Sequence, residues 1–184
     1  TGVDRGDLGM NEDFTTYTEV DPNSHIAKTA QHVDFQDYRN EDAHLYKDKG
    51  EGFFTNFIHL LDVKRVSAQS WAQGHPWMVS NDIDDAKGLK DGNKTALTVW
   101  FYLSGSIHKL GISEYYNGTD YWQGTDIASA TWYYLKIEKS GTSFTCKVYS
   151  DSARTNLLAT LSLTLHGAWN FRYIFVCNTW NSNN

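Results

Sequence analysis

Hydrophobic and polar residues alternate in short segments along the chain, and the clearest alternation lies at residues 131–149, TWYYLKIEKSGTSFTCKVY. Every second residue from 133 to 137 points to one side of an extended chain, which is the spacing of a half-buried strand. Ser140-Gly141 supplies a turn, because glycine reaches positive φ without steric cost. Residues 144–148 then repeat the alternation. The segment predicts an antiparallel hairpin that lies with one face on a core.

Similar strand patterns, separated by turn residues, recur along the chain. Asn117-Gly118 predicts a two-residue hairpin turn. Gly74 and Pro76 interrupt one pattern, which we expect to form strand ends around a bend. Residues 95–103 are the most apolar of these patterns and predict a central strand. The predicted strands are residues 14–20, 26–35, 44–47, 56–63, 70–80, 95–103, 109–116, 119–123, 131–149 (two strands), 157–165 and 171–177.

The remaining segments predict no regular structure. Residues 1–12 read as an extended lead-in, residues 37–42 and 81–93 as polar loops, and residues 178–184 as a polar tail. No segment shows the apolar spacing of an amphipathic helix. About a dozen short strands in one chain of this size predict an all-β domain spanning residues 1–184, either a two-sheet sandwich or a barrel.

Composition narrows the classes of partner. The formal net charge is −6 and no run of Lys and Arg occurs, which argues against nucleic acid and anionic membranes as partners. No apolar run approaches the length of a transmembrane span, and the first residues lack both signal-peptide features and an initiator Met. We therefore expect a processed or excised chain. Seven Trp and eleven Tyr exceed the needs of packing, so some rings should be exposed.

The two cysteines, Cys146 and Cys177, both fall inside predicted strands. Two buried thiols and a disulfide between neighbouring strands are both compatible with this placement. No cysteine pair has the spacing of a metal site.

Three motifs carry a resemblance to a known family: FTTYTEVDPN at 14–23, TWYYLKIEKSG at 131–141, and FTCKVYSDSARTNLLATLSL at 144–163. They resemble the concanavalin A-like lectin/glucanase superfamily, in particular laminin G-like modules of microbial, phage and environmental proteins. The resemblance implies a jelly-roll, a sandwich of two curved antiparallel sheets. It also implies a function between glycan binding, protein contact, glycoside hydrolysis and polysaccharide lysis.

One departure from the family concerns the end of the chain. Such domains usually close with a strand that pairs near the first strand, but only TWNSNN follows Asn178 here. We expect either that this strand is missing or that the lead-in or a partner chain replaces it. An open edge of this kind would favour strand addition or a homo-oligomer.

Catalytic motifs of the family are not found. A retaining glucanase of this fold needs two glutamates on one strand face, and the six glutamates of the chain form no such pair. A lyase would need an Arg-x-Glu strand, which is absent, while Ser106-Ile107-His108 matches the Gln-Ile-His strand only faintly. The sequence therefore predicts a protein that is not an enzyme.

A calcium site has some support. Asn81, Asp82, Asp84 and Asp85 offer hard oxygen ligands in one loop, although they do not match an EF-hand. Many members of the family carry a structural Ca²⁺ near the edge of the sandwich, so the resemblance implies one here. A solvated loop without metal is the other interpretation.

The remaining signal is aromatic. Eight Trp and Tyr residues gather in the middle of the chain among Asn and Asp: Trp71, Trp77, Trp100, Tyr102, Tyr115, Tyr116, Tyr121 and Trp122. Sugar rings stack on such side chains, while Asn and Asp bind hydroxyl groups. Trp100 belongs to an apolar strand and should pack in the core. For Trp77, Tyr115, Tyr116 and Trp122, which lie near turn residues, exposure and core packing both remain open.

These observations favour a non-catalytic module that recognises a polysaccharide, in a secreted, surface or viral protein at the cell exterior or on a virion. The predicted ligand-binding residues are Trp77, Asn81, Asp82, Tyr102, Tyr115, Tyr116 and Trp122. The alternative is a structural or oligomerisation module of a virion or surface fibre. Surplus aromatic residues favour the first function, and a missing closing strand favours the second.

Overall fold

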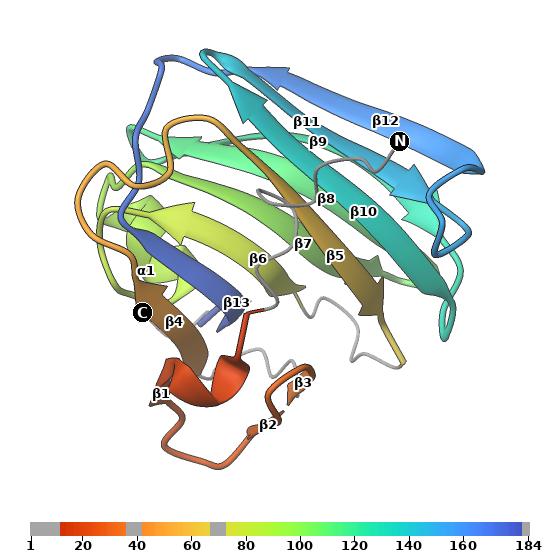
Figure 1. Cartoon of the computed structure of the whole chain (residues 1–184), viewed down its shortest axis with the longest axis horizontal. Helices are drawn as coiled ribbons and strands as arrows, with labels where there is room; N and C mark the ends of the chain where they lie inside the picture. The colour runs from red at the N-terminus through yellow and green to blue at the C-terminus, as the bar shows by residue number, and fades with distance from the viewer. Residues whose placement is uncertain (1–11, 36–41, 67–72, 182–184) are drawn as a thin grey trace, which may run out of the picture.

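The computed structural model describes residues 12–35, 42–66 and 73–181, and almost all of its regular structure is β-strand (Figure 1). Of the predicted segments, residues 1–11, 36–41, 67–72 and 182–184 lie outside the described residues. The strands are β1 (Thr18–Val20), β2 (Ile26–Lys28), β3 (Val33–Phe35), β4 (His44–Asp48), β5 (Phe57–Lys64), β6 (Gln73–Ser80), β7 (Ala96–Ser104), β8 (Ile107–Tyr116), β9 (Thr119–Ile127), β10 (Trp132–Ser140), β11 (Ser143–Tyr149), β12 (Leu157–Thr164) and β13 (Tyr173–Thr179). A 3-10 turn, η1 (Phe14–Thr16), and a short helix, α1 (Ala86–Asp91), complete the described elements.

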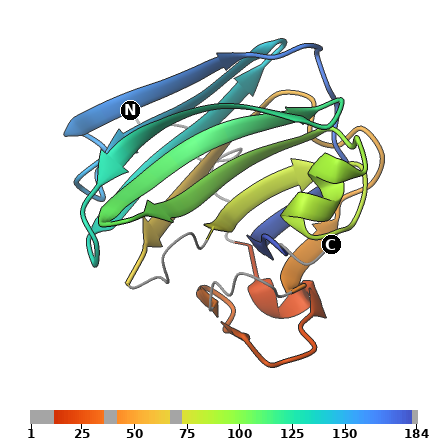
Figure 2. The ribbon, with the colours of Figure 1, turned by 180° about the vertical axis from the view of Figure 1, so that it is seen from behind.

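Two antiparallel sheets form a sandwich, as predicted. The large sheet has seven strands in the order β1-β4-β13-β6-β7-β8-β9, and the small sheet has four in the order β12-β11-β10-β5. The small sheet lies across one face of the large sheet, and α1 lies against the opposite face (Figures 1 and 2). The large sheet therefore has an inner face toward the small sheet and an outer face that α1 covers at one end.

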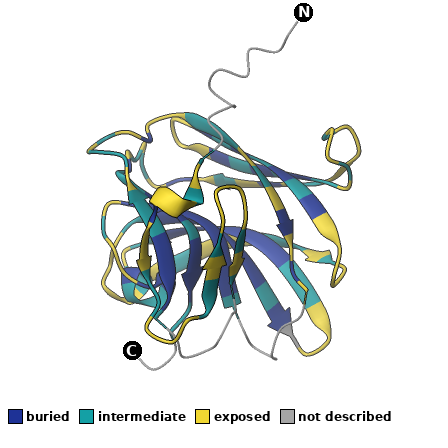
Figure 3. Cartoon of the chain, turned by 60° about the horizontal axis from the view of Figure 1, so that its bottom comes forward, coloured by how far each residue is buried: buried dark blue, intermediate teal, exposed yellow. Residues whose placement is uncertain are grey.

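The core fills the space between the sheets. Alternate residues of each strand point inward, so that Leu97 and Val99 of β7 and Leu135 and Ile137 of β10 belong to one core cluster, all fully buried. Along β10 and β11 buried residues alternate with half-buried ones, whereas almost every described residue of β7 is buried. Figure 3 colours each residue by its burial. Inward Leu, Ile, Val and Phe side chains each contribute about 1.5–3 kcal/mol by leaving water. The period of 2 in the sequence is thus the signature of this core.

Both predicted hairpins are present. β10 and β11 pair from Tyr134↔Tyr149 to Ser140↔Ser143, and Gly141 takes a φ of +56° in the turn. β8 and β9 are joined by Asn117 and Gly118, which both have positive φ. β7 pairs on both sides, with β6 and β8, as expected of a central strand.

Several predicted segments differ from the structure. Residues 26–35 form two short strands with a turn rather than one strand, and residues 14–16 are η1 rather than strand. β6 runs unbroken through Gly74 and Pro76, because a β-bulge absorbs the interruption that we read as a bend. The predicted loop at 81–93 contains α1, for which Asp85 is the N-cap: its side chain accepts hydrogen bonds from the backbone N–H groups of Lys87 and Gly88.

The end of the chain also differs from the prediction. Asn178 and Thr179, which we assigned to the polar tail, belong to β13 and are buried. β13 lies between β4 and β6, so the last strand itself closes the large sheet, and β1 is the edge strand next to β4.

Both cysteines are free and buried, so of the two interpretations the structure supports buried thiols rather than a disulfide. Burial raises the pKa of Cys146 to about 12, so its thiol stays protonated at neutral pH. Among the described residues, no helix is long and apolar enough to cross a membrane.

Candidate functional site: the outer aromatic face

The outward side chains of β7, β8 and β9 form rows across the large sheet. Cross-strand neighbours share a face, and their pairing gives three successive rows along the strands. The rows are Tyr102–Lys109–Asp126, Trp100–Gly111–Gly124 and Thr98–Ser113–Trp122. We call these nine residues the outer aromatic face. It lies on the same side of the large sheet as α1.

Trp100 forms the floor of this face. A Cβ atom built on Gly111 would lie 2.1 Å from Cζ2 of Trp100, and one on Gly124 would lie 3.0 Å from its Cη2. The two glycines therefore leave room for the indole to lie across β8 and β9. The indole Nε1–H donates to Ser113 Oγ at 2.7 Å, which fixes the orientation of the ring. Trp100 is 5% exposed, so its predicted burial is confirmed, although it packs on the outer face rather than in the core.

Trp122 stands on this floor and is 58% exposed. Its ring meets Trp100 edge to face, with the centroids 5.9 Å apart and the planes at 73°. This contact holds one part of the Trp122 indole and leaves the rest in solvent. A large aromatic ring fixed by its neighbour but open to water is suited to stacking against a flat ligand.

Polar groups border the two indoles. Lys109 Nζ forms an ion pair with Asp126 Oδ1 at 2.7 Å in the row beyond Trp100. On the other side, Asp120 lies in the next row, opposite Tyr115, and its Oδ1 is buried without a hydrogen-bond partner. Burial raises the pKa of Asp120, opposed by a hydrogen bond from Ser113. The face thus combines a stacking surface with hydrogen-bond donors and acceptors.

A second group of polar side chains lies on the outer face of β4, β13 and β6. His44 pairs with Asn178, and Asn178 pairs with His75, so the three residues form one row across three neighbouring strands. All three are buried, and each has an atom without a hydrogen-bond partner among the described residues: Nε2 of His44, Oδ1 of Asn178 and Nε2 of His75. We call this the buried polar row. Residues 75 and 76 face Trp100 together at the β-bulge of β6, which links the row to the outer aromatic face.

The inner face carries one buried carboxylate that sequence reasoning did not single out. Glu114 on β8 is 1% exposed, and its Oε2 lies 2.8 Å from Nδ1 of His166. Its oxygens also accept hydrogen bonds from the backbone N–H of His166 and, at 2.6 Å, from Nε1–H of Trp169. The His166 ring stacks on Tyr116, 4.4 Å between centroids. These contacts anchor the loop between β12 and β13. No local signal could have shown them, because Glu114 and His166 are 52 positions apart.

The structure separates the predicted ligand-binding residues. Tyr102 and Trp122 share the outer aromatic face, and Tyr116 stacks on His166 at the end of β8. Trp77 is a core residue, 3% exposed, that donates from Nε1 to His59 Nδ1 at 3.0 Å, and Tyr115 is fully buried under α1. Packing rather than exposure therefore describes these two rings.

Asn81 and Asp82 lie outside the outer aromatic face, between β6 and α1. Asn81 Nδ2 donates to the backbone oxygen of Asn170 at 2.8 Å, and Asp82 pairs with Lys94 at 2.9 Å. Asp85 caps α1 and also accepts from the backbone N–H of Asn181, while Asp84 accepts from the N–H of Asp85. Within residues 12–35, 42–66 and 73–181, no group of three or more His, Cys, Asp or Glu side chains could hold a metal ion. The calcium site stays a prediction.

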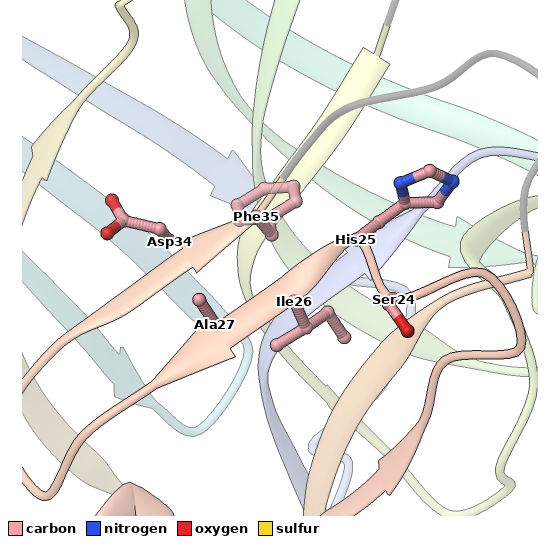
Figure 4. A pocket seen from close by; sticks show the side chains of 6 residues that line it. All are labelled: Ser24, His25, Ile26, Ala27, Asp34 and Phe35. Carbon is pink, nitrogen blue, oxygen red and sulfur yellow. The ribbon is translucent and has the colours of Figure 1, made fainter.

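Two hollows in the described part of the chain lie away from the two indoles. One, of about 420 Å³, opens between the edges of the two sheets beside β9 and β12. The other, of about 140 Å³, lies in the β2–β3 hairpin between Ile26 and Ala27 of β2 and Asp34 and Phe35 of β3, with Ser24 and His25 before β2 completing its lining (Figure 4).

Comparison with known proteins gives a likeness of fold. No protein-family model matches the chain, and no curated protein sequence is detectably similar to it. The enzymatically active domain of tailspike protein 2 from bacteriophage CBA120 matches with a TM-score of 0.51 and 11% identity, over 88% of this chain and 24% of that chain. The full-length tailspike protein 2 of the Escherichia coli O157:H7 bacteriophage matches with a TM-score of 0.52 and 11% identity, over 88% of this chain and 22% of that chain.

A protein of unknown function from Saccharomyces cerevisiae matches with a TM-score of 0.60 and 13% identity, over 89% of this chain and 85% of that chain. The chain thus spans about a quarter of the length of the tailspike structures. These likenesses support the β-sandwich, while membership of the concanavalin A-like superfamily stays a prediction.

The comparison corrects one prediction. We predicted from the missing glutamate pair and lyase strands that the chain is not an enzyme. A domain of similar fold is described as enzymatically active. The lack of those two motifs therefore does not exclude catalysis on this fold, and the prediction is withdrawn.

Proposed function

We propose that the chain is a carbohydrate-binding domain of a virion-associated or extracellular surface protein and that it holds a polysaccharide on the outer aromatic face. The likeness to domains of phage tailspike proteins supports a role of this kind. The proposal concerns the domain alone, because the chain corresponds to about a quarter of those proteins.

One observation carries the proposal: the exposed indole of Trp122 meets the ring of Trp100 edge to face, and polar side chains lie on both sides of the pair. The ring of Trp100 itself lies over Gly111 and Gly124. The C–H faces of a sugar ring pack on such an indole, and Lys109 and Asp126 are placed to bind hydroxyl groups. The rows span three strands, or about 10 Å, which is the length of roughly two sugar units. A polymer is therefore a better fit than a single sugar.

The experiment measures binding to dextran, mannan, alginate and the polysaccharide part of bacterial lipopolysaccharide by affinity electrophoresis. We expect at least one of them to retard the wild type and Trp122→Ala to lose about tenfold in affinity, because an aromatic stacking contact is worth about 0.5–1.5 kcal/mol beyond the area it buries. Trp132→Ala is the matched control, since Trp132 is an exposed indole on β10 in the small sheet.

Equal loss of affinity in both variants, or no retardation by any polysaccharide, would contradict the proposal. A reducing-end assay on each polysaccharide that binds then measures directly whether the chain cleaves it.

A further inference from the structure

The buried polar row has an arrangement that packing does not explain. Polar atoms buried in a folded protein almost always have hydrogen-bond partners, and each atom left without one destabilises the fold. Here three neighbouring strands each place one such atom on the outer face, from His44, Asn178 and His75. Apolar residues at the same positions would avoid the penalty, and the adjacent outward positions Met78 and Phe175 are in fact apolar.

The hydrogen bonds of the row fix which atoms are free. Thr98 Oγ1 lies 2.9 Å from His75 Nδ1 and 2.9 Å from the backbone oxygen of Trp77. Because a carbonyl only accepts, the hydroxyl donates to Trp77 and accepts from Nδ1–H of His75. The unpartnered Nε2 of His75 therefore carries a lone pair. Burial lowers the pKa of His75 to about 3, so the imidazole is neutral at pH 7.

His44 and Asn178 follow the same logic. Burial lowers the pKa of His44, so its imidazole is neutral at pH 7. Nδ1–H donates to Oδ1 of Asp42 at 3.1 Å, which leaves Nε2 as an acceptor. Asn178 uses its Nδ2 to donate to the backbone oxygen of Asp84 at 3.0 Å, which leaves Oδ1 as the free atom. The row thus presents three hydrogen-bond acceptors and needs a ligand that donates.

Trp180 covers the His75 end of this row, while the Asp84 carbonyl of the loop before α1 lies against Asn178. The Trp180 ring stacks on His75 with the centroids 6.2 Å apart and the planes at 21°, and it meets Tyr115 edge to face at 6.4 Å. Within the part of the chain that the structure describes, the hydroxyl of Tyr115 is a further buried polar atom without a hydrogen-bond partner. Trp180 follows the last strand and is half-buried, held by the hydrogen bond from the Asn181 N–H to Asp85 at 3.2 Å.

We propose that the buried polar row is a second subsite on the outer face, which binds the hydroxyl groups of a carbohydrate when Trp180 moves aside. This inference rests on the proposed carbohydrate binding and extends it from the outer aromatic face toward β4. Hydroxyl groups of sugars donate to imidazole and amide acceptors. When the Trp180 indole leaves the face of His75, a sugar ring packs in its place. In the absence of carbohydrate, Trp180 shields the His75 end of the row from water.

The decisive variant is His75→Phe, which keeps a ring of similar size and removes the free acceptor. We expect it to weaken binding of the retained polysaccharide about tenfold. It also removes the hydrogen bond from Nδ1–H to Thr98, but the Thr98 hydroxyl keeps its bond to the Trp77 carbonyl, so we expect a smaller fall in Tm than in the control below. The matched control is His59→Phe, a second neutral histidine, which lies on the inner face and accepts from Trp77. There we expect a lower Tm, because Trp77 Nε1–H loses its acceptor, and unchanged binding.

A second variant tests the cover. Trp180→Ala should bind the same polysaccharide more tightly or with a faster association rate, because the His75 end of the row is then open. Weaker binding by Trp180→Ala would make Trp180 a stacking residue and would overturn its role as a cover.

The outcomes separate the two proposals. If Trp122→Ala loses binding but His75→Phe binds as the wild type does, or if the Tm of His75→Phe falls as that of His59→Phe does, the subsite is wrong and the proposed function stands. If the wild type binds none of the four polysaccharides, both fail. ¹⁵N chemical shifts of the histidine Nε2 atoms, measured with and without polysaccharide, report directly whether a hydroxyl donates to His44 and His75.

Discussion

At the scale of single residues, the outer aromatic face depends on glycines whose role is steric. Gly111 lies under the Trp100 indole, and any side chain there would occupy the same space as the ring. A strand pattern in the sequence cannot show this, since Ile112 and Leu110 on either side mark β8 clearly whatever residue 111 is. The identity of Gly111 has meaning only once β7 lies beside β8.

We predict that Gly111→Ala lowers the free energy of unfolding by about 1–3 kcal/mol, because the new methyl group forces Trp100 or the strand to shift. Gly124→Ala should have a smaller effect, as its Cβ would lie 3.0 Å rather than 2.1 Å from the ring. Chemical denaturation of both variants measures the difference, and indole fluorescence reports any change around Trp100. Equal stability of Gly111→Ala and the wild type would show that the indole does not lie across β8.

At the scale of elements, the chain shows which parts of a β-sandwich a sequence reveals. The β10–β11 hairpin and the β8–β9 turn follow from local alternation and from Asn117-Gly118, and both are present. α1 could not be predicted from the sequence, because its six residues are too few to show an apolar periodicity and lie inside a polar segment. Its one local signal was Asp85 as an N-cap, which we assigned to a loop ligand. The same holds for the candidate site. Tyr102 and Trp122 were among the predicted ligand-binding residues. His44, His75 and Asn178 become neighbours only because β4, β13 and β6 lie side by side in the sheet.

The cap of α1 provides a test at this scale. Burial raises the pKa of Asp85, against the backbone hydrogen bonds that it accepts from Asn181, Gly88 and Lys87. The folded state therefore holds the proton more tightly than the unfolded state. Stability from this group is present below the ordinary pKa of 3.8 and is lost as the pH rises through the higher folded pKa.

We predict that Asp85→Asn, which keeps the cap without the charge, is at least as stable as the wild type at pH 7. Its stability should not fall as the pH rises through the pKa of Asp85. Asp85→Ala should lower the free energy of unfolding by about 1–2 kcal/mol, because the helix loses its cap and Asn181 loses its acceptor. Thermal unfolding between pH 3 and pH 7 compares the three proteins. A Tm of Asp85→Asn as low as that of Asp85→Ala would show that the charge itself is needed.

At the scale of the whole molecule, the two ends of the large sheet differ as surfaces for association. β1 has three residues, and Glu19 on it pairs with Lys28 at 2.9 Å, so this edge is short and charged. Short, charged edges resist pairing with another chain. β9 has nine residues, and in the described sheets no strand pairs with its free edge, although β12 of the small sheet lies alongside it, where Gln123 Oε1 accepts from the Ser162 N–H at 2.5 Å. The expected open edge beside the first strand is thus the less suitable of the two.

We therefore propose that self-association, the alternative role that we drew from the sequence, would run through β9. Static light scattering over a wide range of protein concentration should show a dimer that Tyr121→Lys abolishes, because a lysine on an edge strand prevents pairing. Tyr121 is 41% exposed, but its ring lies 4.4 Å from that of His166, so the Tm of the variant is measured beside its oligomeric state. Thr18→Lys on β1 is the matched control and should dimerise like the wild type.

If Thr18→Lys is the variant that abolishes the dimer, association runs through β1. A strict monomer at all concentrations would rule out assembly as a function of this domain. Trp122 lies on the same strand, so a dimer through β9 should compete with polysaccharide binding. The measured affinity for polysaccharide should then fall as the protein concentration rises.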